Sequence, residues 1–439
     1  MESEARDGLS FTTPLVLHDE KYNLCERKTE EVEANHYHSS KTGTTTFLKT
    51  CFNGLNALSV LFGSTGVGIL SVPYALSEGG WLSLTLLLVF ALGAFYTGLL
   101  MQRCMDVDSR IRTYPDIGER AFGNKGRMVV SIFMYLELYL VATGFLIIEG
   151  DNLHNLFPNT GFDVAGQRIN GRQSFVLVVA LIILPSVWLN NLSILSYISA
   201  TGVIASIIIV GSILWIGAVD GVGFHGKGRL LNLTGVPTSV SLYAFCYCAH
   251  PVFPTLYTSM RNKKQFSKVL VFCFVICTIS YALMAVLGYL MYGSNVQSQV
   301  TLNLPIEKLS SKVAIFTTLV NPITKYALMV TPIVTAIESS LSGYCNKRSI
   351  SLLIRTMLLI STVIVALVVP FFGYLMSLVG AFLSVTASIL LPCLCYLKIS
   401  GTYERRSYEL VIIIGIMLMG ISVVIIGTYT SVVQIIRHL

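Results

Sequence analysis

Charged residues are scarce in this sequence. Only 12% of its 439 residues are Asp, Glu, Lys or Arg, and 54% are apolar, whereas soluble domains carry roughly 25% charged residues. The stretches 175–219 and 356–397 hold no charge at all, and about 20 apolar residues suffice to cross the roughly 30 Å of a bilayer core. This scarcity excludes an ordinary soluble domain and predicts an all-α polytopic membrane protein.

Several catalytic and processing motifs are also absent. The sequence has no H-E-x-x-H and no G-x-S-x-G, and its C-x-C pairs at 246/248 and 393/395 have no histidine cluster beside them. We therefore expect no enzyme activity, no metal and no cofactor. No basic stub leads into a short apolar core, so we expect no secretory signal peptide. The basic residues lie mostly in loops between spans, so we expect no nucleic-acid partner; membrane lipids are the expected surroundings.

The first 46 residues have a different composition, with nine acidic and five basic residues and no long apolar run. They predict a disordered, acidic cytosolic tail, with a folded regulatory segment as the alternative. Residues 47–439 predict the transmembrane domain. Apolar windows place its eleven spans at about 48–77, 81–102, 128–150, 174–190, 193–218, 237–259, 269–292, 313–340, 350–371, 374–397 and 410–433.

The distribution of Lys and Arg predicts the orientation. With a cytosolic N-terminus, sixteen of these residues fall in inner loops or at inner span ends and seven on the other side, as the positive-inside rule requires. An odd number of spans then puts the C-terminus in a lumen or outside the cell. The sequon at Asn232 lies in an outer loop, where it is a candidate for glycosylation. No cysteine falls in an outer loop, so we expect no structural disulfide.

Two predicted spans contain residues that interrupt helices. Span one holds a glycine-rich stretch followed by Pro73, which predicts two half-helices joined near 63–67; span six holds Pro251 and Pro254 around His250. Unwound backbone survives in a bilayer only where it lines a cavity or is buried in protein. The two breaks are five spans apart, which predicts inverted repeats at about 48–218 and 237–397 and an extra helix at about 410–433. Paired breaks of this kind mark the binding site of many transporters.

These interrupted spans resemble a known family. The stretches "NALSVLFGSTGVGILSVPYALSEGGW" (56–81), "AHPVFPTLYTSM" (249–260) and "NPITKYALMVTPIVTAIE" (321–338) are similar to the amino acid/auxin permease family. Within it they resemble the plant vacuolar amino acid transporter branch, which is related to the vesicular inhibitory amino acid transporters. The likeness runs from about residue 47 to the C-terminus. It implies a LeuT-like fold, eleven spans, proton-coupled movement of neutral amino acids by symport or antiport, and a vacuolar membrane.

An amino acid presents a carboxylate and an ammonium group, so its site needs both donors and acceptors. Amides at the start of the second half-helix of span one point partial positive charge at a carboxylate, and freed carbonyls in both breaks accept from the ammonium. Aromatic and thiol side chains are expected to select the substrate side chain, with a lipid-facing position or core packing as the alternative for the aromatics. The candidate substrate-binding residues are Gly63, Ser64, Thr65, Gly66, Val67, Gly68, Phe245, Tyr247, Cys248 and Tyr135.

Three ionisable residues within spans are candidates for coupling transport to protons: Lys325, Glu137 and His250. Intramembrane charges are costly and usually face a partner or cavity. A Glu137–Lys325 pair that only holds the scaffold together is the alternative for the first two, and a hydrogen-bonded core histidine is the alternative for the third. In sodium-coupled relatives of the implied fold, a cation sits between the break in span one and the middle of span eight. Lys325 there would repel Na⁺, so we expect H⁺ as the coupling ion and no requirement for Na⁺.

We therefore expect a secondary active transporter with alternating access around the two breaks. An amino-acid-sensing receptor of the same fold is the alternative, because it would bind substrate without moving much of it, and a channel is the weaker one. The sequence leaves open which amino acid is transported, the direction of transport and the oligomeric state. A monomer is consistent with the sequence. A plasma membrane or another endomembrane is the alternative to the vacuole.

Overall fold

The computed structural model describes residues 68–158, 160, 162–164, 167–188, 192–260, 262–340, 347–369, 371–401 and 408–438, within the unit Gly54–Leu439. The expected N-terminal tail and the expected break at 63–67 lie outside the described residues. The first half of predicted span one therefore rests on hydropathy alone. The described structure begins at Gly68, within this span.

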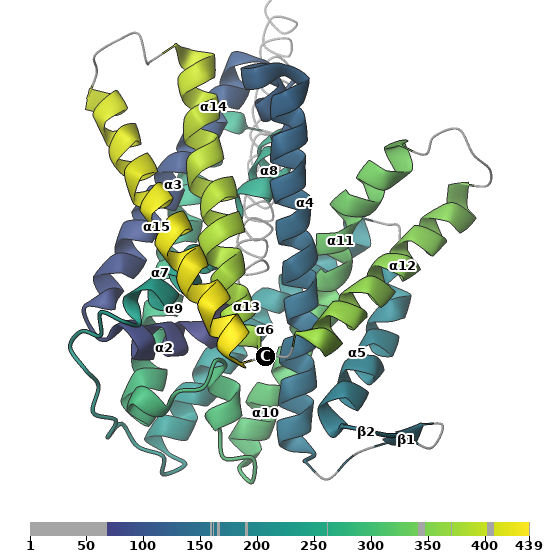
Figure 1. Cartoon of the computed structure of the whole chain (residues 1–439), viewed down its shortest axis with the longest axis vertical. Coiled ribbons are helices and arrows are strands. Elements are labelled where there is room, and N and C mark those ends of the chain that lie inside the picture. Colours follow the sequence, from purple (N-terminus) through teal and green to yellow (C-terminus); the bar gives the residue numbers. More distant parts are fainter. Residues whose placement is uncertain are drawn as a thin grey trace, which may run out of the picture. The chain divides into compact units, whose positions relative to one another are not determined.

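The described chain is helical apart from one short antiparallel hairpin, in which Phe162 pairs with Ile169. This confirms the predicted all-α class (Figure 1). In chain order the elements are α2 (Gly68–Gly79), α3 (Ser83–Val107), α4 (Tyr114–Leu156), β1 (Phe162–Val164), β2 (Gln167–Ile169), α5 (Gly171–Val187), α6 (Leu192–Ala218), α7 (Val236–Cys246), η1 (His250–Val252), α8 (Phe253–Ser259), η2 (Lys263–Gln265), α9 (Phe266–Tyr292), η3 (Gly293–Asn295), η4 (Val300–Asn303), α10 (Leu309–Thr318), α11 (Val320–Ser340), α12 (Lys347–Val368), α13 (Phe372–Leu378), η5 (Val379–Ser384), η6 (Thr386–Leu390), α14 (Leu391–Ser400) and α15 (Tyr408–His438).

Six of the described helical segments are long and apolar enough to cross a membrane. They are Ser83–Val107, Tyr114–Leu156, Lys263–Asn295, Arg348–Val368, Phe372–Ser400 and Tyr408–His438. Two shorter apolar helices, Gly171–Val187 and Ile204–Ala218, fall where two further spans are predicted. The helix ends lie within a few residues of most predicted spans, and the total of eleven stays a prediction.

Helix α4 is much longer than the predicted span 128–150 because its N-terminal part is amphipathic rather than apolar. Its first turn is fixed by a capping box, in which the backbone N–H of Thr113 donates to the Asp116 carboxylate at 2.9 Å. A kink follows at Phe122 and Gly123, where Gly123 takes a φ of +66° that suits glycine. Charged residues around this kink hid the helix from a hydropathy search.

The predicted break in span six is confirmed. Helix α7 ends at Cys246, a short 3-10 turn begins at His250, and α8 begins at Phe253. Pro251 lies in the first turn of η1 and Pro254 in the first turn of α8, positions where the missing N–H of proline costs no intrahelical bond. The two prolines thus start new helical segments, and the peptide groups between Cys246 and His250 are left outside regular helix.

The tenth predicted span contains a second irregularity, which the sequence did not predict. Between α13 and α14 the chain forms two π-helical segments, η5 and η6, a geometry often found at functional sites. Gly380 in η5 lies so close to α7 that a Cβ there would sit 1.9 Å from the carbonyl oxygen of Ser241. Only glycine fits this contact, which brings the wide π segment directly against the end of α7.

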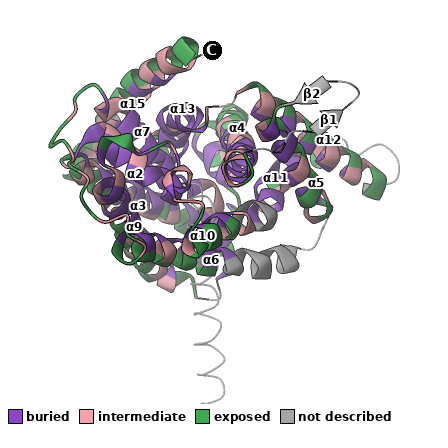
Figure 2. Cartoon of the chain, turned by 90° about the horizontal axis from the view of Figure 1, so that it is seen from below, coloured by how far each residue is buried: buried purple, intermediate pink, exposed green. Residues whose placement is uncertain are grey.

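Burial follows the expectation for a membrane protein (Figure 2). Buried side chains cluster between the helices, and the exposed outer positions are themselves largely apolar; on α15 they include Ile412, Leu418 and Ile425. Such a surface suits contact with lipid rather than water. In Figure 1 the β1–β2 hairpin and α10 lie at one end of the helices, which we call the hairpin side, and the C-terminal end of α14 and the start of α15 lie at the other.

Candidate functional site

The first described turn of α2 lies against the end of α7. A Cβ on Gly68 would sit 2.9 Å from Sγ of Cys246, closer than carbon and sulfur approach in normal packing. Because Gly68 carries no side chain, the first described turn of α2 can reach the break of span six. That amides of span one bind a carboxylate beside this break stays a prediction.

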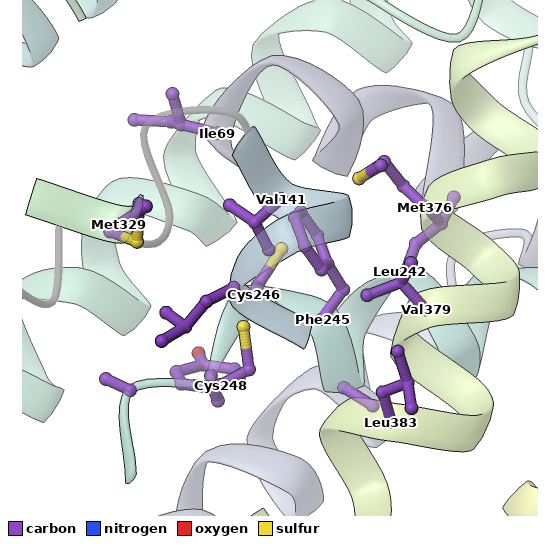
Figure 3. Packing of buried hydrophobic residues seen from close by; sticks show 14 of the residues in the cluster. Ile69, Val141, Leu242, Phe245, Cys246, Cys248, Met329, Met376, Val379 and Leu383 are labelled. Atoms are coloured by element: carbon purple, nitrogen blue, oxygen red, sulfur yellow. The ribbon is translucent and has the colours of Figure 1, made fainter. Parts of the chain in front are cut away.

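The side chains of Phe245 and Tyr247 diverge from the end of α7. Phe245 is fully buried, and its Cβ lies 3.0 Å from the position that a Cβ on Gly380 would take; Figure 3 shows its ring beside Val141. Tyr247 points to α9 instead, where its hydroxyl lies 2.9 Å from Oγ1 of Thr278 and its ring stacks on Phe274 at 5.8 Å. Both aromatics make the packing contacts that the sequence left as the alternative to pocket lining.

Cys248 and Glu137 do come together. Glu137 on α4 is only 1% exposed, and the thiol of Cys248 and the hydroxyl of Ser384 in η5 lie near enough to influence its carboxylate. Neither Glu137 oxygen has a hydrogen bond of normal geometry within the described residues, and neither does Oγ of Ser384 or of Ser388 in η6. A buried polar group without a partner costs free energy. The break of span six therefore faces a buried carboxylate whose polar neighbours are a thiol and a hydroxyl group.

His250 is bonded to α3. Its Nε2 lies 3.1 Å from the carbonyl oxygen of Ala94 and 2.9 Å from Oγ1 of Thr97. A carbonyl only accepts, so Nε2 must carry the hydrogen. The ring is fully buried and lies 4.8 Å from that of Phe253, and its Nδ1 has no partner within the described residues. These contacts match a histidine that holds the broken helix on α3, which the sequence left as the alternative to proton transfer.

Lys325 is fully buried on α11. It does not pair with Glu137, because neither oxygen of Glu137 has a bonding partner in the described part of the chain. The scaffold pair that the sequence offered as an alternative is therefore not formed. Met329, one helical turn beyond Lys325, belongs to the same buried cluster as Ile69 and Cys246 (Figure 3). Lys325 itself lies on α11, which packs against α4, α5, α6 and α12, and its distance from 63–67 stays a prediction.

The remaining predicted residues are divided between described and undescribed parts of the chain. Gly63, Ser64, Thr65, Gly66 and Val67 lie outside the described residues. Tyr135 is half-buried on α4 and is two residues from Glu137, so it points about 200° around the helix from it and does not join the cluster. Asn232 is half-buried in a loop, where its Oδ1 accepts from the hydroxyl of Thr234 at 2.8 Å.

Two serines at this site were missed at the level of sequence. Ser384 and Ser388 are small polar residues in an apolar run, and nothing in their spacing distinguishes them from serines that bond their own helix. Only the π geometry of η5 and η6 turns both hydroxyls away from such partners.

Comparison with known proteins agrees with this architecture. The family model described as "Transmembrane amino acid transporter protein" matches residues 44–433. The chain belongs to this family. It is 60% identical over 395 residues to "Amino acid transporter AVT1I" of Arabidopsis thaliana, covering 90% of this chain and 96% of the relative. It is 63% identical over 395 residues to "Amino acid transporter AVT1J" of the same plant, covering 90% and 92%. The resemblance seen in the sequence is confirmed.

The fold has a counterpart among solved structures outside the family. A Na⁺-coupled sialic acid symporter, solved in a substrate-bound outward-open state, superposes with a TM-score of 0.52 at 13% identity, covering 87% of this chain and 89% of the symporter. At this identity the likeness shows the fold alone, and it supports the predicted LeuT-like architecture. As a member of an amino acid transporter family, the chain is a multi-pass membrane protein of amino acid transport.

Proposed function

We propose that this protein is a secondary active transporter that couples the movement of neutral amino acids to protons. The observation that carries the proposal is the meeting of three elements at one place: the N-terminus of α2, the unwound segment 246–250, and the unpartnered carboxylate of Glu137. The first favours a carboxylate, the second offers carbonyls to an ammonium group, and the third can exchange a proton.

The charge of the site supports neutral substrates. At the break, Glu137 adds negative charge beside Cys248 and Ser384, and no described residue forms an ion pair with it. In a medium of low dielectric constant, an acidic substrate side chain placed there would be repelled by several kcal/mol. The packed aromatic rings of Phe245 and Tyr247 leave the small groups of Cys246 and Cys248 to face the substrate side chain.

Three residues remain candidates for the coupled proton, and they differ in support. Glu137 has the geometry of an exchangeable group because its oxygens have no fixed partner. His250 is held by Ala94 and Thr97, which suits anchoring better than exchange. Lys325 is fully buried on α11, and its proposed role is to take the place of a cation. We propose that Glu137 exchanges the proton and that Lys325 makes Na⁺ unnecessary.

The proposed orientation has the N-terminus in the cytosol and the hairpin side in a lumen, in agreement with the Lys/Arg bias. We propose the vacuolar membrane, following the resemblance of the sequence to the vacuolar branch. In this arrangement the β1–β2 hairpin, η4 and the loop that carries Asn232 face the acidic compartment. Fluorescence of a tagged protein against vacuolar and plasma-membrane markers tests the location.

Transport into liposomes that contain the purified protein tests the function. A panel of labelled amino acids is offered with and without an imposed pH gradient. We expect saturable uptake of neutral amino acids that the gradient accelerates. Uptake without saturation would indicate a channel, and binding without uptake would indicate a receptor.

Variants locate the site. Cys248→Ala should change the KM for substrate several-fold, because Cys248 lies at the break beside Glu137. Cys104→Ala is the matched control: this cysteine is equally buried, but it lies near the far end of α3 beside Cys395. It should leave KM unchanged. Equal KM values for both variants and the unmodified protein would exclude the break of span six as the substrate site.

A further inference from the structure

A second buried polar cluster lies near the hairpin-side end of α4, twelve residues or about 18 Å along the helix from Glu137. Its centre is Glu149, which is 1% exposed. Asp151 on α4 and Thr318 at the end of α10 lie near enough to influence its carboxylate. Hydrogen bonds and an ion pair join these two to Asn152 on α4, Arg172 on α5, Gln299 before η4 and Thr301 in η4. Neither the substrate site nor the coupling residues described above include any of them.

Most donors of this cluster are already engaged. Arg172 forms an ion pair with Oδ1 of Asp151, and Nε2 of Gln299 donates to Oδ2 of Asp151 at 3.1 Å. The hydroxyl of Thr301 donates to Asn152 at 2.7 Å. The amide of Asn152 lies 3.4 Å from Oγ1 of Thr318, which itself donates to the carbonyl of Ile315 at 2.6 Å.

Two acceptors are left over. Oε2 of Glu149 and Oε1 of Gln299 are buried and have no hydrogen-bond partner within the described residues. Gln299 is itself fully buried, and its amide is already oriented by Asp151. At Oε2, an ionised Glu149 carboxylate lacks a donor that would stabilise its charge. Protonation of Glu149 removes that charge.

The local charges agree with one bound proton. The ionisable groups on the elements packed against this part of α4 are Asp151 and His154 on α4, Arg172 on α5, Lys312 on α10 and Lys325 on α11. Asp151 is neutralised by Arg172, and Lys312 is exposed. Lys325 lies on the next helix, α11, seven residues after Thr318 in the sequence. Arg355 of α12 lies at the other end of the bundle, where it bonds the carbonyl of Val187.

The cluster also has a connection to solvent. The side chains of Arg172 and Asp151 are 18% and 16% exposed, whereas Glu149 is buried. Thr301 and Gln299 attach the η4 segment to α4 at this point. A movement of η4 away from α4 would therefore open Glu149 to the solution on the hairpin side.

We propose that Glu149 is a proton-binding site on the hairpin side of the transporter, loaded when η4 is closed on α4 and exchanging with the solution when η4 moves away. This inference rests on the proposed proton-coupled function. It adds a second carboxylate, distinct from Glu137, which binds a proton from the compartment that the hairpin side faces.

The test measures substrate uptake into liposomes while only the pH on the hairpin side is varied. For a single required proton, the rate of the unmodified protein changes by up to about tenfold per pH unit on one side of the midpoint. Glu149→Gln keeps the shape of a protonated carboxyl but cannot titrate. We expect its rate to vary less than about twofold over the same range, with an unchanged KM, because Glu149 lies outside the substrate site.

Glu307→Gln is the matched control, since Glu307 is an exposed carboxylate in the loop between η4 and α10. It should retain the full pH dependence. If Glu149→Gln does not fold, Glu149→Asp serves instead: the shorter acid should shift the midpoint of the pH profile while keeping its slope. A full pH response in Glu149→Gln, or an unshifted midpoint in Glu149→Asp, overturns the assignment of Glu149. If the uptake rate of the unmodified protein does not change with pH, the proposed proton-coupled function is overturned as well.

Discussion

Gly68→Ala tests the contact between α2 and the break of span six. The new Cβ would lie 2.9 Å from Sγ of Cys246, 3.5 Å from its Cα and 3.6 Å from its Cβ. Only the first distance is too short, by about 0.8 Å, because packed atoms of this size prefer roughly 3.5–4.0 Å. Cys246 is fully buried, so its thiol has little room to turn away.

The expected loss of stability is moderate. Overpacking a core by one methyl group costs about 1–3 kcal/mol, and replacing glycine by alanine returns about 0.4–1 kcal/mol through the unfolded chain. We therefore expect Gly68→Ala to destabilise the protein by about 1–2 kcal/mol. In a Cys246→Ala background the thiol is gone and the remaining contacts are normal. The double variant should be no less stable than Cys246→Ala, which gives a coupling energy of about 1–2 kcal/mol.

Thermal unfolding of the purified variants in detergent compares the stabilities of Gly68→Ala, Cys246→Ala and the double variant. Gly415→Ala is the control, since a Cβ at Gly415 of α15 meets nothing within 4 Å; it should match the unmodified protein. Additive losses in the double variant would refute the argument from the Cys246 thiol. Substrate binding adds a second result: if Cys246→Ala restores stability to Gly68→Ala but not affinity, the Cβ intrudes on the carboxylate directly, as the sequence first suggested.

Three further predictions follow from single features. Gly380→Ala should prevent normal folding, because its Cβ would meet the carbonyl of Ser241 at 1.9 Å and backbone cannot yield; a normal yield of folded protein would contradict this. Asn232 should carry a glycan in eukaryotic membranes. The sequon Asn191-Leu192-Ser193, between predicted spans four and five on the expected cytosolic side, should not, and a mass shift abolished by Asn191→Gln would invert the orientation. Replacing sodium by choline at a fixed pH gradient should leave uptake unchanged if Lys325 takes the place of a cation, and a collapse of uptake would refute that role.

The parts of the fold that depend on local chemistry could be predicted from sequence. Apolar length placed α9, expected at 269–292 and found at Phe266–Tyr292, because a bilayer span is set by its run of apolar side chains. Pro251 and Pro254 predicted the break, because proline cannot continue a helix. The amphipathic start of α4 and the π segments η5 and η6 could not be predicted. The first is hidden by its charges, and the second depends on contact with α7.

The site was predicted less completely for the same reason. Cys248 was chosen for its place at the break and Glu137 for its charge in a span, and both lie in one cluster. Tyr135 was chosen as an aromatic near the middle of the same helix, but its position on α4 turns it away. Ser384 and Glu149 gave little signal, since serine is common in apolar helices and Glu149 falls at the predicted end of a span. Their roles depend on which donors the folded chain leaves unused.

Glu137 and Glu149 lie on the same helix but near different elements. Glu137 meets Cys248 and η5 at the break of span six, so a substrate that shifts the end of α7 changes its surroundings directly. Glu149 lies near Thr318 at the end of α10, outside the proposed substrate site. If both proposals hold, closing η4 loads Glu149 while movement of α7 governs Glu137, and α4 links the two over about 18 Å. Because α4 also packs against α5, α11 and α12, it can stay fixed while α7 and η4 move. Opening either element then exposes only the carboxylate beside it, which is the condition for a proton to bind on one side of the membrane and leave on the other.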